Sequence, residues 1–356
     1  MKKYLIVIAA AAMLAGCAKN EVVTPDGNAP AEITFTTAPV TKAVSTFDTG
    51  NVFETYAVYT AGDYSYSSTA SWDQFITFST VRYSNRTWRI DSDNDGDIDS
   101  DDTSYFWPKD GGKLSFFSWS LNTDELTFVD GTEPNISFAN TQGLSLYNYV
   151  SGNDFMVADP ALDKIENSYY TYDHIGVPTL FRHKAAQIIF YIKTAQDYGK
   201  TFKLKSIAFE NVSTTGSYTQ GSDPTGSPST EAWDADDSYE TTYYYNSASG
   251  RVIPAITAEA VPANGTAILI PQSFSDTDGK NLILTYTITS GTTTQTKIAT
   301  VKMNTLLGGS SSQTTALQKG KKYTITLSIS SGNEILWTPE VVDWVDEAKT
   351  ISVTES

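Results

Sequence analysis

The residues whose types and spacing carry the clearest chemistry form an acidic run at positions 91–102. Carboxylates stand at positions 1, 3, 5, 9 and 12 of this run, with glycine at position 6 and an apolar residue at position 8. EF-hand-type loops use this spacing to surround Ca²⁺ with flexible oxygen ligands, and their glycine permits a sharp turn. The sequence therefore predicts a structural Ca²⁺ site, with the candidate ligands Asp91, Asp93, Asp95, Asp97 (through its carbonyl oxygen), Asp99 and Asp102.

Two features separate this acidic run from an EF-hand. Its last position is Asp102 rather than glutamate, which makes bidentate coordination less secure, although dockerin-type loops resemble this version. The flanking residues 86–90 and 104–107 are strand-like, so the run joins two strands instead of two helices. The alternative is a solvated acidic hairpin tip that binds no ion. Either interpretation is structural, because no base or nucleophile accompanies the carboxylates.

The second chemical signal is the single cysteine, Cys17. Lys2 and Lys3 precede an apolar run that is shorter than the roughly 20 residues needed to cross a bilayer but suits a signal peptide. The run ends in Leu14-Ala15-Gly16-Cys17, which resembles the lipobox of bacterial lipoproteins, where the thiol takes a diacylglycerol. We predict that cleavage removes residues 1–16 and that several acyl chains on Cys17 anchor the protein. The alternative is an unmodified signal-peptide cysteine.

Composition and missing motifs exclude several classes of function. One cysteine rules out a disulfide framework and a cysteine-based zinc site, and a net charge of −17 disfavours nucleic acid as a partner. Neither His174 nor His183 accompanies a nucleophile elbow, so each is interpreted as a hydrogen-bonded histidine at a strand end. Metalloprotease, dinucleotide-binding and Walker motifs are absent from the sequence. We therefore expect no enzyme activity and no nucleic-acid binding.

The rest of the chain is dominated by short strand patterns. β-Branched and aromatic residues alternate with polar ones between Gly, Asn, Asp and Ser, which is typical of β-sandwich strands. Helical periodicity is nearly absent, apart from a turn or two of helix expected within residues 160–167. The sequence predicts an all-β fold, and 356 residues suggest about two domains. We place the domain boundary within residues 168–178 and interpret residues 211–250 as long loops of the second domain.

Several segments, in their order along the chain, resemble the fimbrillin family, the Mfa-like pilins of type V pili in Bacteroidales. The matching segments are the lipobox at Cys17, residues 33–35 with 39–43, Trp88, Tyr105-Phe106-Trp107-Pro108, residues 113–119, Asp154-Phe155-Met156-Val157-Ala158, residues 180–186, residues 320–327, Ile335-Leu336-Trp337 and Val342-Asp343-Trp344. The acidic run is a departure from the family's minimal pattern.

The resemblance implies two tandem transthyretin-like antiparallel β-sandwich domains and no catalysis. The expected order is a signal peptide (1–16), a lipidated tether with a removable first strand (17–42), an N-terminal sandwich (43–178) and a C-terminal sandwich (179–356). The family's subunits travel to the outer membrane as lipoproteins, and a trypsin-like protease cuts after a basic residue near the first strand, here between Lys42 and Ala43. The C-terminal strand of another subunit then fills the opened groove, and residues 350–354 alternate suitably for such a donor.

These observations favour a structural or adhesive subunit of a cell-surface type V pilus (fimbria). A surface glycan-binding lipoprotein is the alternative, and it would present exposed, coplanar Trp or Tyr platforms rather than bury its seven tryptophans in sandwich cores. A lipid-anchored glycoside hydrolase would need a cleft with two carboxyl groups about 5–10 Å apart. Residues 18–42 could also be a simple spacer in which Lys42 is an ordinary surface lysine.

Overall fold

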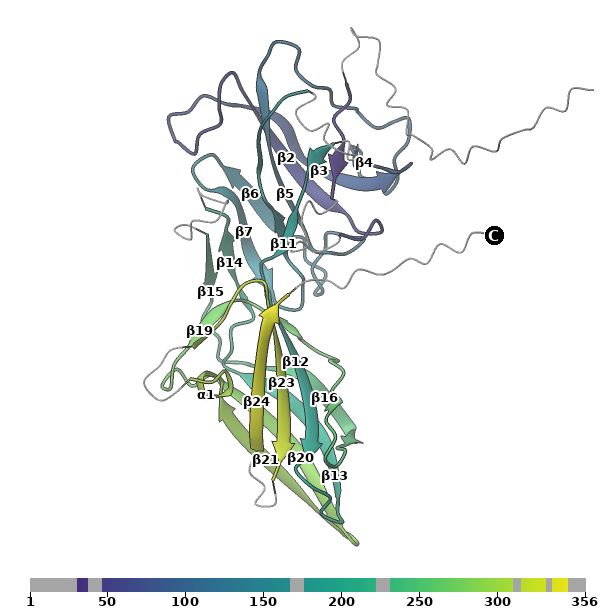
Figure 1. Cartoon of the computed structure of the whole chain (residues 1–356), viewed down its shortest axis with the longest axis vertical. Coiled ribbons are helices and arrows are strands. Elements are labelled where there is room, and N and C mark those ends of the chain that lie inside the picture. Colours follow the sequence, from purple (N-terminus) through teal and green to yellow (C-terminus); the bar gives the residue numbers. More distant parts are fainter. Residues whose placement is uncertain are drawn as a thin grey trace, which may run out of the picture.

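A computed structural model describes residues 31–37, 47–166, 176–221, 231–309, 315–330 and 335–344. In these ranges the chain forms 24 strands and a single four-residue helix, α1 (Met303–Leu306), which confirms the predicted all-β class. Figure 1 shows the strands gathered into two bodies along the long axis of the molecule. None of the helical structure in the described part of the chain is long and apolar enough to span a bilayer.

The largest sheet belongs to the N-terminal body. In spatial order its strands are β10 (Val177–Pro178), β1 (Phe35–Thr36), β4 (Thr87–Asp91), β3 (Asp73–Ser84), β2 (Phe53–Thr60), β5 (Lys113–Ser120), β8 (Met156–Ala158) and β11 (Phe181–His183), and β9 (Ala161–Lys164) also pairs with β5. The sheet curves, because side chains from both of its ends meet in one core. Phe35 from β1 and Phe181 from β11 both pack against Phe53 in this core.

A second sheet covers the other face of the central strands. It has the order β15 (Ala232–Ala235), β14 (Thr215–Thr219), β7 (Gly143–Val150) and β6 (Asn135–Ala139). Phe117 and Trp119 of β5 point into the core beneath this sheet, whereas Leu114 and Phe116 point into the core that contains Phe35. Both faces of β5 are therefore buried, which explains its nearly continuous apolar sequence.

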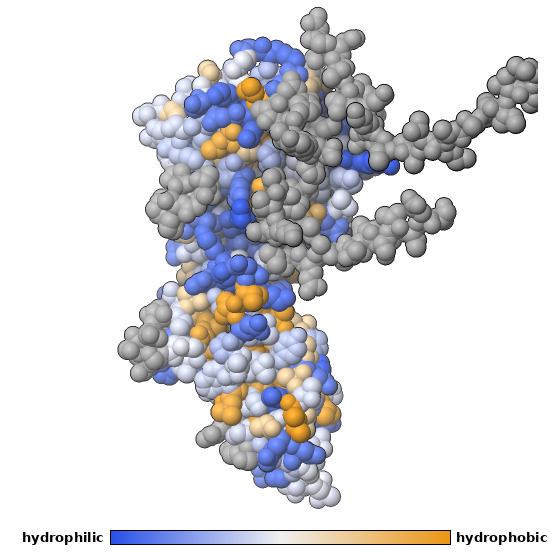
Figure 2. All heavy atoms as spheres, viewed as in Figure 1, coloured by the Kyte–Doolittle hydropathy of each residue, from blue (hydrophilic) through white to orange (hydrophobic). Residues whose placement is uncertain are grey.

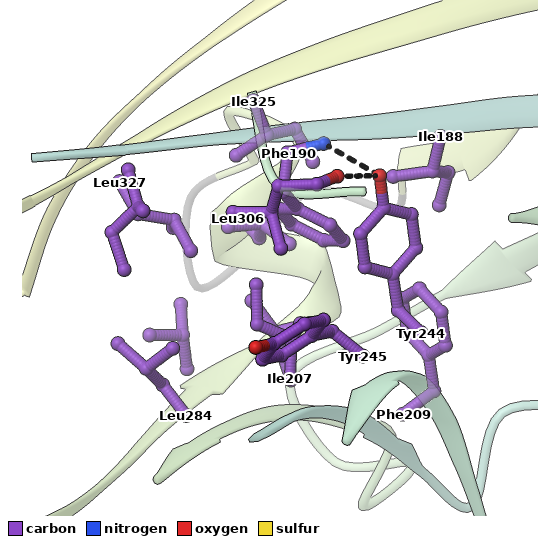
Figure 3. Close-up of a cluster of buried hydrophobic side chains, with 14 of the residues drawn as sticks. Ile188, Phe190, Ile207, Phe209, Tyr244, Tyr245, Leu284, Leu306, Ile325 and Leu327 are labelled. Atoms are coloured by element: carbon purple, nitrogen blue, oxygen red, sulfur yellow. Dashed lines mark hydrogen bonds between the residues drawn. The ribbon is translucent and has the colours of Figure 1, made fainter. Parts of the chain in front are cut away.

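The C-terminal body is a β-sandwich. One sheet has the order β17 (Glu259–Ala260), β12 (Ala186–Thr194), β23 (Lys321–Ile329) and β24 (Ile335–Asp343), with β18 (Ile268–Leu269) also on β12. The other has the order β16 (Thr241–Val252), β13 (Thr201–Glu210), β20 (Asn281–Ser290) and β21 (Thr293–Lys302), and β19 (Gln272–Phe274) pairs separately with β22 (Thr315–Leu317). Figure 3 shows Ile188 and Ile325 of the first sheet facing Ile207 and Leu284 of the second across this core.

Two local expectations from the sequence were wrong. Residues 211–250, expected as long loops, contain β14, β15 and most of β16, because their alternating Tyr and Trp side chains pack against neighbouring strands. Residues 161–164, expected near a helical turn, form strand β9. Since β14 pairs with β7, strand pairing also crosses the domain boundary that we predicted at residues 178 and 179. The placement of that boundary stays a prediction.

Candidate functional site

The first described segment, residues 31–37, is an alternating strand seated in the N-terminal core. Ile33, Phe35 and Thr37 are 2%, 1% and 8% exposed, whereas the intervening side chains are only half-buried. Phe35 lies edge-on to the rings of Phe53 and Phe116, with centroid separations of 5.7 and 5.8 Å. This alternation places every second side chain in the core, as the sequence pattern predicts.

Backbone hydrogen bonds hold this segment on both sides. On one side, the Val177 amide donates to the Thr34 carbonyl at 2.7 Å. On the other side, Phe35 pairs with Trp88 of β4, and the Ile33 amide donates to the Tyr105 carbonyl at 2.8 Å. The segment is therefore an interior element of the sheet, and its removal would leave unpaired backbone groups on three neighbours.

Gly176 permits the close approach of β10 to this strand. Its φ is +125°, a conformation that side chains disfavour, and a Cβ at this position would lie 2.7 Å from the Phe35 carbonyl carbon. Only glycine fits here without displacing the strand.

The acidic loop, which we define as residues 91–102, begins at the last residue of β4. Asn94 and Gly96 have φ values of 56° and 107°, so the chain reverses where the sequence predicts a turn. One carboxylate oxygen from each of Asp91, Asp93 and Asp95 lies within 4.8 Å of the others, and Asp95, Asp97 and Asp99 form a second such group. Five of the six predicted ligands thus come together, with Asp97 contributing its carboxylate to the second group.

Asp102, the sixth predicted ligand, lies in neither carboxylate group. Its Oδ1 accepts hydrogen bonds from the amide and hydroxyl of Ser92, and its Oδ2 accepts one from the Asp99 amide at 3.0 Å. Burial alone would raise the pKa of Asp102, but these donors outweigh it and lower the pKa. Asp102 therefore closes the ends of the loop.

The exposed carboxylates of the acidic loop repel one another. The pKa of Asp93 is raised by partial desolvation and by the charges of Asp95, Asp102 and Asp91, against a hydrogen bond from the Asp95 amide. The pKa of Asp97 is raised chiefly by the charge of Asp95. Crowding of negative charge is thus the main cause of the Asp97 shift and a secondary cause of the Asp93 shift, and a bound cation would relieve it.

Asp91 differs from the other aspartates because its side chain is fully buried. Its Oδ2 accepts hydrogen bonds from Arg82 Nε at 2.6 Å and from the Gly96 amide at 3.3 Å. Its Oδ1 is buried without a hydrogen-bond partner. Asp91, Asp93 and Asp95 are accordingly the residues best placed to hold a metal ion.

The remaining predicted site residues lie outside the described residues. They are Cys17, Lys42 and Ala43. The candidate donor strand at residues 350–354 and His174 also lie outside the described residues. The other histidine, His183, stacks on Trp344 with a centroid separation of 4.0 Å, and its Nδ1 lies 2.7 Å from Asp154 Oδ1. Such a buried, hydrogen-bonded histidine at the end of β11 has the structural role expected from the sequence.

The structure contains one ionic cluster that was not predicted from the sequence. Lys184 Nζ lies 2.8 Å from Glu231 Oε1, Lys319 also pairs with Glu231, and Tyr218 donates to Glu231 at 2.6 Å. Burial lowers the pKa of Lys184; burial alone would raise the pKa of Glu231, but these partners lower it to about 2. No local motif could have revealed this cluster, because its four members come from four separate segments.

The tryptophans and one pocket bear on the carbohydrate-related alternatives. All seven tryptophans lie in described segments, and each is buried or half-buried, so they fill cores rather than form an exposed platform. A pocket of about 320 Å³ beside the acidic loop is lined by Glu54, Glu125 and Glu133. Burial raises the pKa of Glu54, although Trp119 Nε1 donates a hydrogen bond to its carboxylate.

The C-terminal strand β24 presents an unpaired edge. It pairs with β23 on one side and with no described strand on the other. Leu336, Val341 and Val342 are 54%, 49% and 46% exposed, and Figure 2 shows apolar surface where Figure 1 places this strand. Exposed edges with apolar side chains readily accept another strand.

Comparison with protein families agrees with the sequence resemblance. The family model described as fimbrillin-like matches residues 36–344. A comparison with curated proteins finds no significant match. Among solved structures, one from Bacteroides uniformis, provisionally assigned to cell adhesion, is 15% identical over 89% of this chain and 98% of its own, with a TM-score of 0.49.

Two further solved structures are similar at the same low level of identity. A fimbrial protein from Bacteroides vulgatus is 16% identical over 82% of this chain and 93% of its own, with a TM-score of 0.47. The fimbrial anchor protein Mfa2 from Porphyromonas gingivalis is 12% identical over 89% of this chain and 98% of its own, with a TM-score of 0.32.

Proposed function

Because the chain belongs to the fimbrillin-like family, we propose that it is a structural or adhesive subunit of a type V pilus, exported as a lipoprotein and assembled by proteolysis and strand exchange. The family consists of fimbrial structural proteins rather than enzymes. Its members belong to cell-surface fimbriae and assemble with other pilin subunits. We propose in addition that the chain is anchored in the outer membrane by a lipid, is cut by a protease and then exchanges a strand with another subunit.

The seating of residues 31–37 is the observation that carries this proposal. The segment contributes Ile33 and Phe35 to a core otherwise built by later residues, and its backbone pairs with three neighbouring segments. Burial of side chains of this size contributes about 1.5–3 kcal/mol each. A groove emptied of this strand would strongly favour a replacement strand with the same alternation.

The processing site in this proposal is the bond between Lys42 and Ala43. Lys42 is the only basic residue between Lys19 and Arg82, so it is the one position at which a trypsin-like protease can cut between the first strand and Arg82. Cleavage there separates residues 31–37 from the rest of the fold. Before cleavage, acylation of Cys17 tethers the chain to the outer membrane.

The replacement strand in this proposal comes from the C-terminus of another subunit. Residues 350–354 alternate as residues 31–37 do, and they follow closely on β24, whose partly apolar outer edge pairs with no described strand. A copy of the chain that donates its C-terminus would bring this edge near the acceptor. The same sequence can therefore act as acceptor at one end and donor at the other.

Limited trypsin treatment of the full-length chain tests the proposal. Cleavage after Lys42 is expected to yield SDS-resistant multimers, and Lys42→Gln should stay monomeric, whereas the matched control Lys19→Gln should behave like the parent. Deletion of the residues after Lys349 should allow cleavage but prevent multimers. A parent chain that is cut after Lys42 and stays monomeric with its C-terminus intact would contradict strand exchange.

Surface glycan binding remains the alternative function. All seven tryptophans are buried or half-buried, which speaks against an aromatic platform built from them, although exposed tyrosines such as Tyr239 are available. Binding of the chain to a soluble polysaccharide, lost in Tyr239→Ala, would favour this alternative. Absence of binding across a panel of polysaccharides would leave the pilus subunit as the supported function.

A further inference from the structure

We propose that the acidic loop binds one Ca²⁺ through Asp91, Asp93 and Asp95, and that the ion holds together the two segments, β4 and residues 104–107, that bind one side of residues 31–37. The ion site stands whether or not the strand is exchanged between subunits. Only the biological use of the coupling rests on the proposed function.

The carboxylate of Asp91 is stronger evidence for a bound cation than the exposed carboxylates of the loop, because it is buried. Its Oδ2 is satisfied by Arg82 and the Gly96 amide, but its buried Oδ1 accepts no hydrogen bond. An unsatisfied buried acceptor costs about 1–3 kcal/mol, and more if it is charged. This oxygen therefore requires a positively charged or hydrogen-donating partner.

The two carboxylates grouped with Asp91, those of Asp93 and Asp95, are unable to donate a hydrogen bond to this oxygen. Asp93 and Asp95 supply carboxylate oxygens that lie within 4.8 Å of an Asp91 oxygen, and ionised carboxylates only accept hydrogen bonds. A cation at about 2.3–2.6 Å from each of three oxygens fits between oxygens separated by this much. Because Arg82 already pairs with the other oxygen of Asp91, a cation held between the three carboxylates would supply the partner that Oδ1 lacks.

The chemistry of the site selects Ca²⁺ over Mg²⁺. Asp93 and Asp95 are exposed side chains on a loop, and Asp97 and Asp99 add further oxygens around Asp95. Ca²⁺ accepts six to eight oxygens in irregular geometry, whereas Mg²⁺ demands near-octahedral coordination and retains its waters. The closely spaced carboxylates on an exposed loop therefore suit Ca²⁺ better than Mg²⁺.

The acidic loop connects two segments that both bind the first strand. Before the loop, Arg89 of β4 forms an ion pair with Glu32, with Nη2 2.6 Å from Oε1. After the loop, Ser104 donates to the same Glu32 oxygen at 3.1 Å, and the Trp107 amide donates to the Ala31 carbonyl at 3.0 Å. An ion that fixes the loop fixes the distance between these segments and so stabilises the seat of the strand.

Calorimetric titration of CaCl2 into the chelator-treated, full-length chain in mild detergent tests the site. We expect one ion per chain with a Kd on the order of 10⁻³ M or tighter. Asp93→Asn and Asp95→Asn should each weaken binding by about tenfold or more. Asp101→Asn removes the same charge from the same loop but alters neither carboxylate group, so it is the matched control and should bind normally. These exposed variants avoid the Arg82–Asp91 pair and should fold.

Three calorimetric results would overturn the site: no heat with the parent chain, equal heat with Asp93→Asn and Asp95→Asn, or equal affinity for MgCl2. Hydrogen exchange then tests the coupling. Saturating Ca²⁺ should slow exchange of the Ile33 and Trp107 amides several-fold, and leave the amides of β12 unchanged. Intact Ca²⁺ binding with unchanged exchange at Ile33 would overturn the coupling. Neither readout requires cleavage or multimers, so a failed ion site is distinguishable from failed strand exchange.

Discussion

Glu32 and Arg89 form a two-pronged ion pair, with Arg89 Nη2 2.6 Å from Glu32 Oε1 and 2.8 Å from Oε2. Glu32 belongs to the removable segment proposed above and Arg89 to β4, so the pair links the two through their side chains. Both side chains are about one-third exposed, at 31% and 33%, so solvent screens much of the attraction. The pair therefore orients the strand more than it stabilises the fold.

Glu32→Ala should lower the free energy of unfolding only slightly but loosen the first strand locally. We expect the free energy of unfolding to fall by about 0.5–1 kcal/mol, because the pair is partly exposed. Amides of residues 31–37 should exchange faster, as measured by hydrogen-exchange mass spectrometry. Glu259→Ala removes a comparable pair with Arg251 in the C-terminal body and should leave that exchange unchanged. Equal exchange in the two variants would argue against a role for Glu32 in seating the strand.

Phe35→Ala should destabilise the protein strongly. The ring is 1% exposed and contacts Phe53 and Phe116, so truncation leaves a cavity and should cost about 3–5 kcal/mol in unfolding free energy. Urea unfolding followed by tryptophan fluorescence measures this cost. Thr36→Ala, at the half-buried neighbouring position, is the control and should cost far less. A cost below about 1 kcal/mol for Phe35→Ala would mean that the segment is not a working part of the core.

Gly176→Ala should loosen the first strand through the backbone. The added Cβ would lie 2.7 Å from the backbone of Phe35 at a residue with φ of +125°, so β10 must move away. We expect a loss of about 1–3 kcal/mol in unfolding free energy and faster trypsin cleavage after Lys42. Gly62→Ala is the matched control, because a Cβ there meets no atom within 4 Å. Unchanged cleavage rates in Gly176→Ala would show that this contact does not hold the strand.

Acid should weaken the fold through Glu231. Its pKa is about 2 in the folded protein against 4.5 ordinarily, so its stabilising effect is complete above pH 4.5 and is lost as the pH falls towards 2. Because Glu231 is largely buried, its share of that loss is on the order of 2–3 kcal/mol. Unfolding free energies measured across this range should fall less steeply in Glu231→Gln, but as steeply as the parent in the exposed control Glu259→Gln. Parallel curves for all three proteins would contradict this role.

Periodicity in the sequence was a good guide where one strand face is buried. The strand at residues 186–194 alternates between buried and half-buried residues throughout, and its β-branched and aromatic residues, AQIIFYIKT, predicted the strand. The alternation at residues 33–37 predicted the seated first strand in the same way. These features depend on local side-chain order, which the sequence contains.

Features that depend on distant partners could not be predicted in this way. Tyr218 and Trp233 looked like loop residues, because the strand β7 against which they pack is about 70 residues earlier in the chain. The spacing of the acidic loop predicted a gathering of carboxylates, but not that Asp102 would bond Ser92 instead of joining them. Nor does any motif predict the burial of Lys184 beside Glu231.

The first residue of the subunit in assembled fimbriae shows whether the first strand has been removed. Polymers sheared from the cell surface would be resistant to SDS, and mass spectrometry of their N-terminal peptide reads the processing site. We expect the polymerised subunit to begin at Ala43, whereas the membrane-bound precursor should begin at acylated Cys17. A polymerised subunit that still carries residues 31–37 would contradict assembly by removal and replacement of the first strand.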